Sequence, residues 1–228
     1  DRSVSRGLGD VYKRQVMTVS MSATAFAADD DGYILKATNE DSKSSDNDLV
    51  IAIEGSVSSM DPANIPDTNA ISATRGVYET LVSFDENQEL TGKLAESWEV
   101  SDDSLTYTFK LRQGVKFQDG TDFNAAAVKA NYDRVVNKDN NLRQRRTFIV
   151  TNEDGSETPR VDSIETPDDY TLVIKLTQAW APFINRLTQF CIISPAALEE
   201  YGNDIMNHPC GTGPYAVSYT HLTLPTIA

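Results

Sequence analysis

Apolar and polar residues alternate along the middle of the chain. The alternation runs through Leu105, Tyr107, Phe109 and Leu111, directly after a polar turn. Because successive side chains of a strand point to opposite faces of a sheet, a period of two indicates a strand with one buried face. We therefore expect an antiparallel hairpin over residues 95–111.

Other stretches have the longer period of an α-helix. Val128, Tyr132 and Val135 share one face of a helix predicted over residues 125–136, which Asn124 can cap. Further helices are expected at residues 70–82, 181–190 and 195–201. Apolar and β-branched runs indicate strands at residues 49–53, 161–164, 170–176 and 191–193. This mixture of helices and strands, without internal repeats, predicts an α/β fold.

The two ends of the chain share a pattern at the level of the genetic code. Residues 10–15 can be encoded by GATGTGTATAAGAGACAG, and the complementary strand of that DNA encodes residues 217–221 in another frame. A short tag joined to both ends of a gene fragment produces such a pairing. We therefore interpret residues 1–15 and 217–228 as translated sequencing adapter and expect the natural sequence in between.

Small and apolar residues follow the first of these ends. Residues 16–28 contain Ala25-Phe26-Ala27, the small-x-small pattern that precedes a signal-peptidase cut, and Asp29 begins an acidic stretch. We interpret residues 16–28 as an incomplete export signal, because a buried helix would continue its apolar period beyond this point. Residues 29–48 hold few large apolar side chains and are expected to form a flexible, disordered spacer.

Acidic residues outnumber basic ones. The chain has 34 Asp+Glu and 20 Lys+Arg, which gives a formal net charge of −14 at pH 7. This charge repels phosphate backbones and anionic lipid headgroups, so nucleic acid and membrane surfaces are disfavoured as partners. No apolar run has the length of a membrane span. The composition indicates a soluble, globular, exported protein.

The sequence contains none of the usual catalytic combinations. Outside the adapter-like ends, His208 is the sole histidine, and Gly211-Thr212-Gly213 leads into Pro214 instead of the lysine of a phosphate-binding loop. Paired aspartates, such as Asp102 and Asp103, occupy turn positions that need no acid–base role. We therefore predict no catalytic residue, no metal site and no cofactor.

Two cysteines, Cys191 and Cys210, are present. An exported protein folds where disulfides form, so the two can pair, but two half-buried thiols fit the sequence as well. A metal site that adds His208 is a weaker alternative, because structural sites usually have four such ligands. The sequence leaves the pairing open.

Several short motifs occur in a fixed order along the chain. They are Ser59-Met60-Asp61-Pro62-Ala63, Val77-Tyr78-Glu79-Thr80-Leu81, Leu94-Ala95-Glu96-Ser97-Trp98, residues 107–117, Asp119-Gly120-Thr121 and Gly211-Thr212-Gly213-Pro214-Tyr215. Together they resemble the family 5 extracellular solute-binding proteins of ABC transporters, which take dipeptides, oligopeptides, glutathione or nickel chelates. Residues 116–131 and 193–199 are most similar to the glutathione-binding branch of that family.

The resemblance implies a class II periplasmic binding protein fold, in which two lobes close over a ligand. It implies that residues 49–216 form most of the first lobe, with 49–68 and 191–216 in one subdomain and 69–190 in the other. It also implies a monomeric periplasmic protein, not an enzyme. Its partners would be a small peptide and the permease of an ABC importer.

Glutathione is the ligand that the resemblance favours. Dipeptides, oligopeptides and nickel chelates are the alternatives within the family. Two other classes remain open: a secreted hydrolase with its catalytic residues beyond Ala216, and a periplasmic scaffold or chaperone.

Two segments are candidate ligand-binding sites. The first is the loop after the strand predicted at residues 49–53, and it holds Ser56, Ser58, Ser59 and Met60. Open α/β sheets place ligands at the carboxyl ends of their strands, where hydroxyls and amides of this loop can meet a carboxylate or a carbonyl. The second segment can bind the carboxylates of an acidic peptide, through Arg143, Arg145 and Arg146. A plain serine-rich turn and a solvated basic face are the alternatives.

Overall fold

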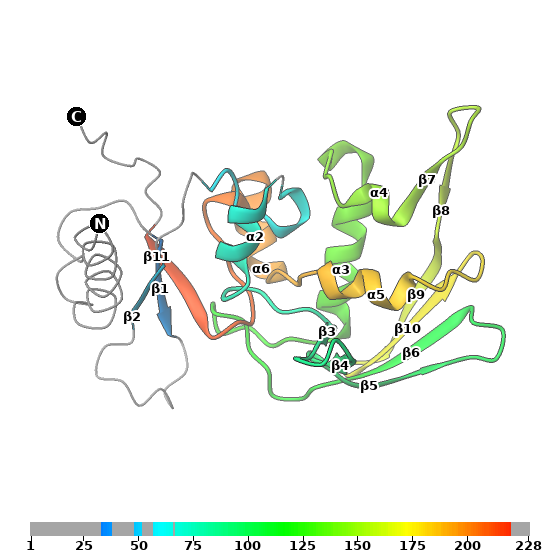
Figure 1. Ribbon diagram of the computed structural model, residues 1–228, viewed down its shortest axis with the longest axis horizontal. Coiled ribbons are helices and arrows are strands. Elements are labelled where there is room, and N and C mark those ends of the chain that lie inside the picture. The colour runs from blue at the N-terminus through cyan, green and yellow to red at the C-terminus, as the bar shows by residue number, and fades with distance from the viewer. Residues whose placement is uncertain (1–32, 38–47, 52–56, 66, 220–228) are drawn as a thin grey trace, which may run out of the picture.

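The computed structural model describes residues 33–37, 48–51, 57–65 and 67–219 (Figure 1). The predicted export signal and the first adapter-like end therefore lie outside the described residues. Of the second adapter-like end, only residues 217–219 are described. The interpretations of these segments stay predictions.

An antiparallel sheet of four strands forms one layer of the molecule. Its order is β5-β6-β10-β9, with bounds β5 (Ala95–Val100), β6 (Thr106–Leu111), β9 (Val161–Asp168) and β10 (Thr171–Leu176). Trp98 of β5 lies opposite Phe109 of β6. The hairpin predicted over residues 95–111 is thus confirmed, and alternate side chains of β6 are buried as the period of two predicts.

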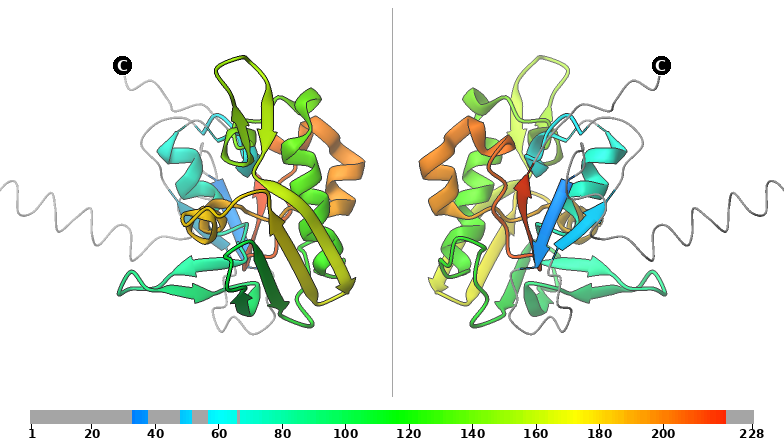
Figure 2. Two further views of the ribbon diagram at one scale, coloured as in Figure 1. Left: turned by 90° about the vertical axis from the view of Figure 1, so that its right-hand side faces the viewer. Right: turned by 90° about the vertical axis from the view of Figure 1, so that its left-hand side faces the viewer.

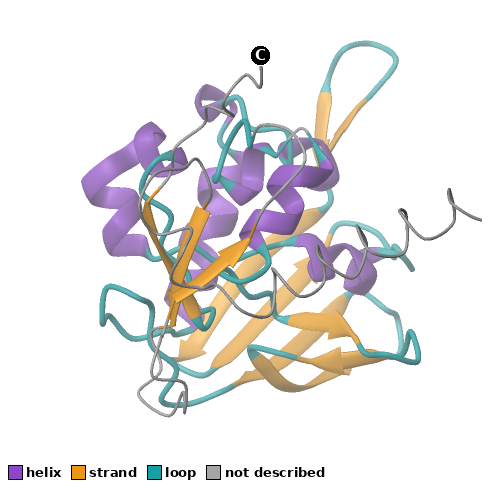
Figure 3. Cartoon of the chain, turned by 60° about the vertical axis from the view of Figure 1, so that its left-hand side comes forward, coloured by secondary structure: helices purple, strands orange, loops and turns teal. Residues whose placement is uncertain are grey.

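Helices lie over one face of this sheet (Figure 3). α3 (Ala125–Val136) begins after Asn124, whose Oδ1 accepts a hydrogen bond from Ala127 N at 2.9 Å, as the sequence predicts. Phe183 of α5 (Phe183–Arg186) is 0% exposed and meets Tyr107 of β6 in an edge-to-face contact at 4.8 Å. A buried aromatic side chain of this kind contributes about 1.5–3 kcal/mol, so such contacts hold the helices on the sheet.

Shorter elements complete the fold. The remaining helical segments are, in chain order, η1 (Pro62–Asn64), α2 (Thr68–Thr74), η2 (Lys138–Asn140), α4 (Arg145–Phe148), η3 (Leu187–Gln189), α6 (Pro195–Tyr201) and η4 (Gly202–Met206). Two small hairpins are formed by β3 (Val82–Phe84) with β4 (Leu90–Gly92), and by β7 (Ile149–Thr151) with β8 (Glu157–Pro159). The β7–β8 hairpin projects from the rest of the molecule (Figure 2).

A second sheet brings the two ends of the described chain together. Its order is β11 (Tyr215–Tyr219), β1 (Tyr33–Ala37) and β2 (Asp48–Ile51), and both pairings are antiparallel. β1 lies within residues 29–48, so the prediction of a flexible spacer is wrong at residues 33–37. This run is largely apolar, and strands on both sides provide partners for its backbone groups.

Two predicted helices and one predicted strand are shorter in the structure. Of the helix expected over residues 70–82, only the first part forms, because α2 ends at Thr74. The helix expected over residues 181–190 is divided into α5 and η3. The strand expected at 191–193 is reduced to one bridge between Cys191 and Thr80. Ile192 N donates to the Glu79 carbonyl at 3.0 Å, and the backbone N–H and carbonyl of Ile193 bond to the Asn131 side chain of α3 instead of to a strand.

The helix-and-sheet class predicted from the sequence is confirmed. All strand pairs within the described residues are antiparallel. The rule that places ligands at the carboxyl ends of parallel strands therefore does not locate a site in this part of the chain. The division of residues 49–216 into two subdomains stays a prediction.

Candidate functional site

The first predicted site is a short loop that leads into η1. Ser56 lies outside the described residues, and we call residues 57–61 the serine loop. Met60 is 2% exposed, its backbone N donates to the Met206 carbonyl at 3.3 Å, and its carbonyl accepts from Tyr78 Oη at 3.1 Å. These contacts correct the prediction of Met60 as a ligand contact, because its side chain packs in the core and its backbone anchors the loop.

The two described serines of the loop leave different hydrogen-bonding groups free. Ser58 is exposed, and its Oγ donates to Asp67 Oδ2 at 2.8 Å. Ser59 Oγ accepts from Asp61 N at 3.1 Å, so its own hydrogen is available to an acceptor. The Ala70 N–H and then the Ser58 hydroxyl lower the pKa of Asp67. The loop can therefore offer a donor at Ser59 and an acceptor at Ser58.

A buried ion pair fastens the end of the serine loop to α3. Arg134 Nη1 and Nη2 donate to Asp61 Oδ1 and Oδ2 at 3.2 and 2.6 Å. Asp61 is 5% exposed, and its Oδ1 also accepts from Ala63 N at 3.0 Å at the start of η1. Two parallel bonds between a guanidinium and a carboxylate fix orientation as well as distance. The sequence does not predict this pair, because 73 positions separate the two residues.

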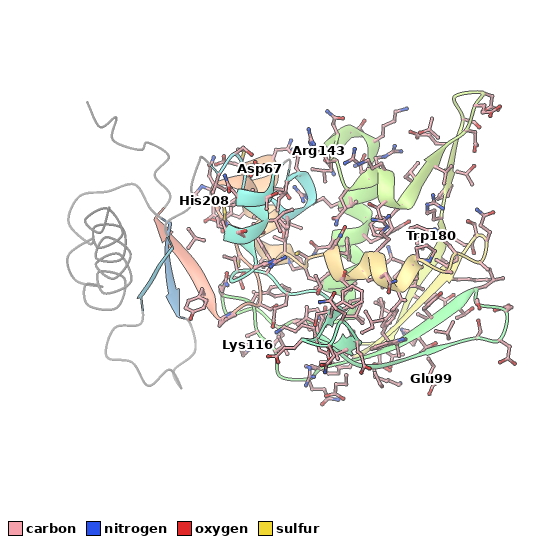
Figure 4. The ribbon with its side chains drawn as sticks, in the orientation of Figure 1. Asp67, Glu99, Lys116, Arg143, Trp180 and His208 are labelled. Atoms are coloured by element: carbon pink, nitrogen blue, oxygen red, sulfur yellow. The ribbon has the colours of Figure 1, made fainter. Side chains whose placement is uncertain are left out.

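The second predicted site is a cavity at the start of α4. It has a volume of about 510 Å³ and is lined by Asn64, Lys138, Asn141, Leu142, Arg143, Arg145, Arg146, Ile149 and Thr151. We call it the arginine cavity. Arg143 and Arg146 are exposed, and neither has an ion pair or a side-chain hydrogen bond within the described ranges. Arg143 extends at the outer edge of the molecule (Figure 4). Two free guanidinium groups in an acidic chain favour the binding of anions in this cavity.

Arg145 has a different role from its two neighbours. Its Nη1 and Nη2 donate to Glu157 Oε1 and Oε2 at 2.7 and 2.8 Å, and its Nε donates to the Val136 carbonyl at 2.9 Å. The bond to Glu157 raises the pKa of Arg145, and the same bond lowers the pKa of Glu157. Arg145 therefore joins α3, α4 and β8. Of the three predicted arginines, Arg143 and Arg146 are free to meet a ligand.

The two predicted sites adjoin each other. Gln144 N donates to the Ala63 carbonyl at 3.0 Å, and Asn64 of η1 lines the arginine cavity. Because the serine loop leads directly into η1, its hydroxyls and the free guanidinium groups lie on neighbouring segments. Asn64 and Lys138 belong to the site only through the fold, and no sequence motif marks them.

Cys191 and Cys210 are free thiols in the structure, so the disulfide considered from the sequence is not formed. Burial raises the pKa of the Cys191 thiol to about 12. Burial, followed by the Asp119 carboxylate, raises the pKa of the Cys210 thiol to about 11. Both side chains are therefore protonated at neutral pH, and protonated thiols are poor nucleophiles.

We expect the folded chain to react slowly with Ellman's reagent at pH 8, because the thiolate is the reactive form and little of it is present. After unfolding in guanidinium without a reductant, both thiols should react. Unfolded chain that releases no colour under these conditions would show a disulfide and contradict the free thiols of the structure.

The described ranges hold neither a metal-binding cluster nor a membrane-spanning helix. No group of three or more His, Cys, Asp or Glu side chains there is placed to hold a metal ion. No helix in the same ranges is long and apolar enough to cross a membrane.

A family profile and a curated relative match this chain. Residues 89–220 match the profile of the bacterial extracellular solute-binding proteins, family 5 Middle. The glutathione-binding protein GsiB of Salmonella typhi is 44% identical over 170 residues, which are 74% of this chain and 31% of GsiB.

Two solved structures of periplasmic binding proteins are also similar to this chain. The periplasmic binding protein DppA of Helicobacter pylori, in complex with the peptide STSA, is 32% identical with a TM-score of 0.56, over 70% of this chain and 34% of DppA. AgaA of A. tumefaciens R10, in complex with agropinic acid, is 28% identical with a TM-score of 0.65, over 73% of this chain and 32% of AgaA.

The matched region covers most of this chain but only about a third of each compared protein. This chain spans 31% of GsiB and a comparable share of the two structures, 34% and 32%. The profile match covers more than half of this chain. The chain therefore belongs to the family 5 bacterial extracellular solute-binding proteins.

Proposed function

We propose that this chain is the first-lobe part of a periplasmic solute-binding protein that captures a small acidic peptide, glutathione first, for an ABC importer. The observation that carries the proposal is the arginine cavity of about 510 Å³, with two free guanidinium groups, beside the serine loop. Family membership supports the class of protein, and the name of the relative GsiB supports the ligand.

The chemistry of glutathione fits these groups. Glutathione has two carboxylates, one ammonium and two peptide groups, and it is anionic at neutral pH. Arg143 and Arg146 can each bind a carboxylate through two parallel hydrogen bonds. Ser59 can donate to a peptide carbonyl, and Ser58 can accept from a peptide N–H. Because the chain as a whole has a net charge of −14, an anionic ligand needs such a local basic site.

A ligand held between two lobes has only part of its contacts in this chain. This chain spans 31% of GsiB, and we propose that the complete protein contributes the second lobe. Association has a fixed entropic cost that does not shrink when contacts are removed. The 228-residue chain alone should therefore bind glutathione weakly or not at all.

Thermal-shift measurements on the complete protein test the proposal. A ligand that binds only the folded state at about 100 times its Kd stabilises that state by about 2.7 kcal/mol, so glutathione should raise Tm clearly. Dipeptides and a nickel–histidine chelate are the competing ligands in the same screen. If none of the three classes raises Tm, the proposal fails. Nanomolar binding of glutathione by the 228-residue chain alone would contradict the need for a second lobe.

Glu157→Gln is expected to strengthen glutathione binding by the complete protein. The substitution removes the carboxylate that occupies Arg145 at 2.7 and 2.8 Å and leaves a third guanidinium beside the cavity. One more unit charge at about 4 Å in water contributes about 1 kcal/mol, or about fivefold in Kd. Isothermal titration calorimetry measures the change, and an unchanged or weaker affinity would contradict the placement of the peptide in this cavity.

A secreted hydrolase is the alternative from another class. We infer that no covalent step occurs, because binding alone is the activity of this family. Mass spectrometry of glutathione recovered after incubation with the complete protein distinguishes the two. Intact glutathione agrees with transport binding, whereas separated glutamate or cysteinylglycine would establish hydrolysis.

A further inference from the structure

We propose that the Asp61–Arg134 pair positions the two halves of the binding site relative to each other. In this role it fixes the serine loop at a set distance from the arginine cavity, so that one ligand meets both. The inference rests on the proposed function, because it requires that both groups contact the same peptide. Asp61 and Arg134 are positioning residues, since both are largely buried, with side chains 7% and 12% exposed.

Hydrogen bonds run without a break from α3 to the serine loop. Arg134 donates to both oxygens of Asp61 at 3.2 and 2.6 Å, and Asp61 N donates to Ser59 Oγ at 3.1 Å. The loop belongs to no helix or strand, so these bonds, the two backbone bonds of Met60 and the bond from Ser58 Oγ to Asp67 help to hold the Ser59 hydroxyl in place. A shift of Arg134 is therefore transmitted to Ser59.

The last turn of α3 also supports the arginine cavity. The Arg134 carbonyl accepts from Asn140 Nδ2 at 2.8 Å, and Asn140 ends η2, whose first residue, Lys138, lines the cavity. The Val136 carbonyl accepts from Arg145 Nε at 2.9 Å. One helical turn thus holds the serine loop through a side chain and the cavity wall through two carbonyls. Within the described residues, this turn links the two halves in addition to the bond from Gln144 N to the Ala63 carbonyl.

A positioning role and a purely structural role predict different results. If the pair only stabilises the fold, its loss lowers Tm and leaves the affinity of the folded protein unchanged. If it positions the loop, affinity falls in fully folded protein. The fall is then largest for a ligand that reaches both halves, and it is small for one that needs only the guanidinium groups.

Three variants of the complete protein separate these roles. The double variant Asp61→Asn/Arg134→Met removes the ion pair without leaving a buried charge, and asparagine can still cap η1. Arg134→Lys keeps the charge but loses the two-bond geometry, and it serves alone if the double variant does not fold. Lys129→Gln is the matched control, because it breaks an exposed ion pair with Asp133 on the same helix.

Calorimetric titration uses glutathione as the ligand that spans both halves and succinate as a dicarboxylate without peptide groups. Below the Tm of each variant, Arg134→Lys and the double variant should bind glutathione about fivefold more weakly, as expected for the loss of one hydrogen bond from Ser59 to a neutral peptide carbonyl. Succinate binding should change by less than about twofold, and Lys129→Gln should match the wild type for both ligands.

Three outcomes overturn the inference in different ways. If wild-type protein binds glutathione and the Arg134 variants bind it equally well, the pair has no positioning role and the proposed function stands. If wild-type protein binds neither glutathione nor any other small peptide, the proposed function fails and the inference fails with it. A parallel loss of glutathione and succinate affinity would likewise overturn it, because the cavity itself would then be disturbed.

Discussion

Replacing Arg134 with methionine is expected to lower the free energy of unfolding by about 3–5 kcal/mol. Methionine removes both hydrogen bonds to Asp61, at 3.2 and 2.6 Å, and leaves a carboxylate that is 5% exposed without a counterion. A buried charge without a partner costs several kcal/mol, whereas a complete pair is close to neutral against apolar residues. Urea unfolding of the 228-residue chain, followed by circular dichroism, measures the change.

A control on the same helix makes this result specific. Lys129 Nζ lies 2.5 Å from Asp133 Oδ2, and the two side chains are 43% and 56% exposed. Lys129→Gln should therefore change stability by less than about 0.5 kcal/mol. Adding Asp61→Asn to Arg134→Met should restore part of the loss, because the orphaned charge is removed. Equal losses for Arg134→Met and Lys129→Gln would contradict the burial of the Asp61–Arg134 pair.

Asn131→Leu is expected to lower the free energy of unfolding by about 2–4 kcal/mol. Asn131 is 2% exposed, its Nδ2 donates to the Ile193 carbonyl at 2.7 Å, and its Oδ1 accepts from Ile193 N at 3.0 Å. The Asn131 side-chain amide thus provides the two hydrogen bonds that a neighbouring strand would give to the backbone of Ile193. Leucine leaves two buried backbone groups without partners, at about 1–3 kcal/mol each, and its own apolar burial offsets part of this cost.

The same substitution at an exposed asparagine provides the comparison. Asn203 of η4 is exposed, so Asn203→Leu should change stability by less than about 0.5 kcal/mol. Urea unfolding of both variants, with equal m-values, isolates the effect of the two lost bonds. If Asn131→Leu is no less stable than Asn203→Leu, the bonds to Ile193 contribute nothing measurable.

Local patterns in the sequence predicted the elements that depend on near neighbours. The β5–β6 hairpin follows from alternation through Leu105 to Leu111, and α3 follows from its period and its Asn124 cap. The order of the short motifs along the chain was also sufficient to predict the family. These features rest on propensities and turn chemistry, which a single sequence carries.

Features that depend on distant partners could not be predicted in this way. β1 forms because β2 and β11 lie on both sides of it, although its surroundings read as a spacer. Arg145 was grouped with Arg143 and Arg146 by sequence, yet its bond to Glu157 is made only in the fold. Asp61 lies in one of the family motifs, but nothing in the sequence indicated its pairing with Arg134. A charge in a sequence does not tell whether its partner is a ligand or another residue.

The central claim is that Arg143 and Arg146 bind the carboxylates of a small peptide, with glutathione as the first candidate. The most direct test is calorimetric titration of glutathione into the complete protein and into its Arg143→Gln/Arg146→Gln variant. Both side chains are exposed, so Tm should stay the same. We expect micromolar or tighter binding by the wild type and at least about tenfold weaker binding by the variant. Equal affinity of the two proteins would contradict the claim.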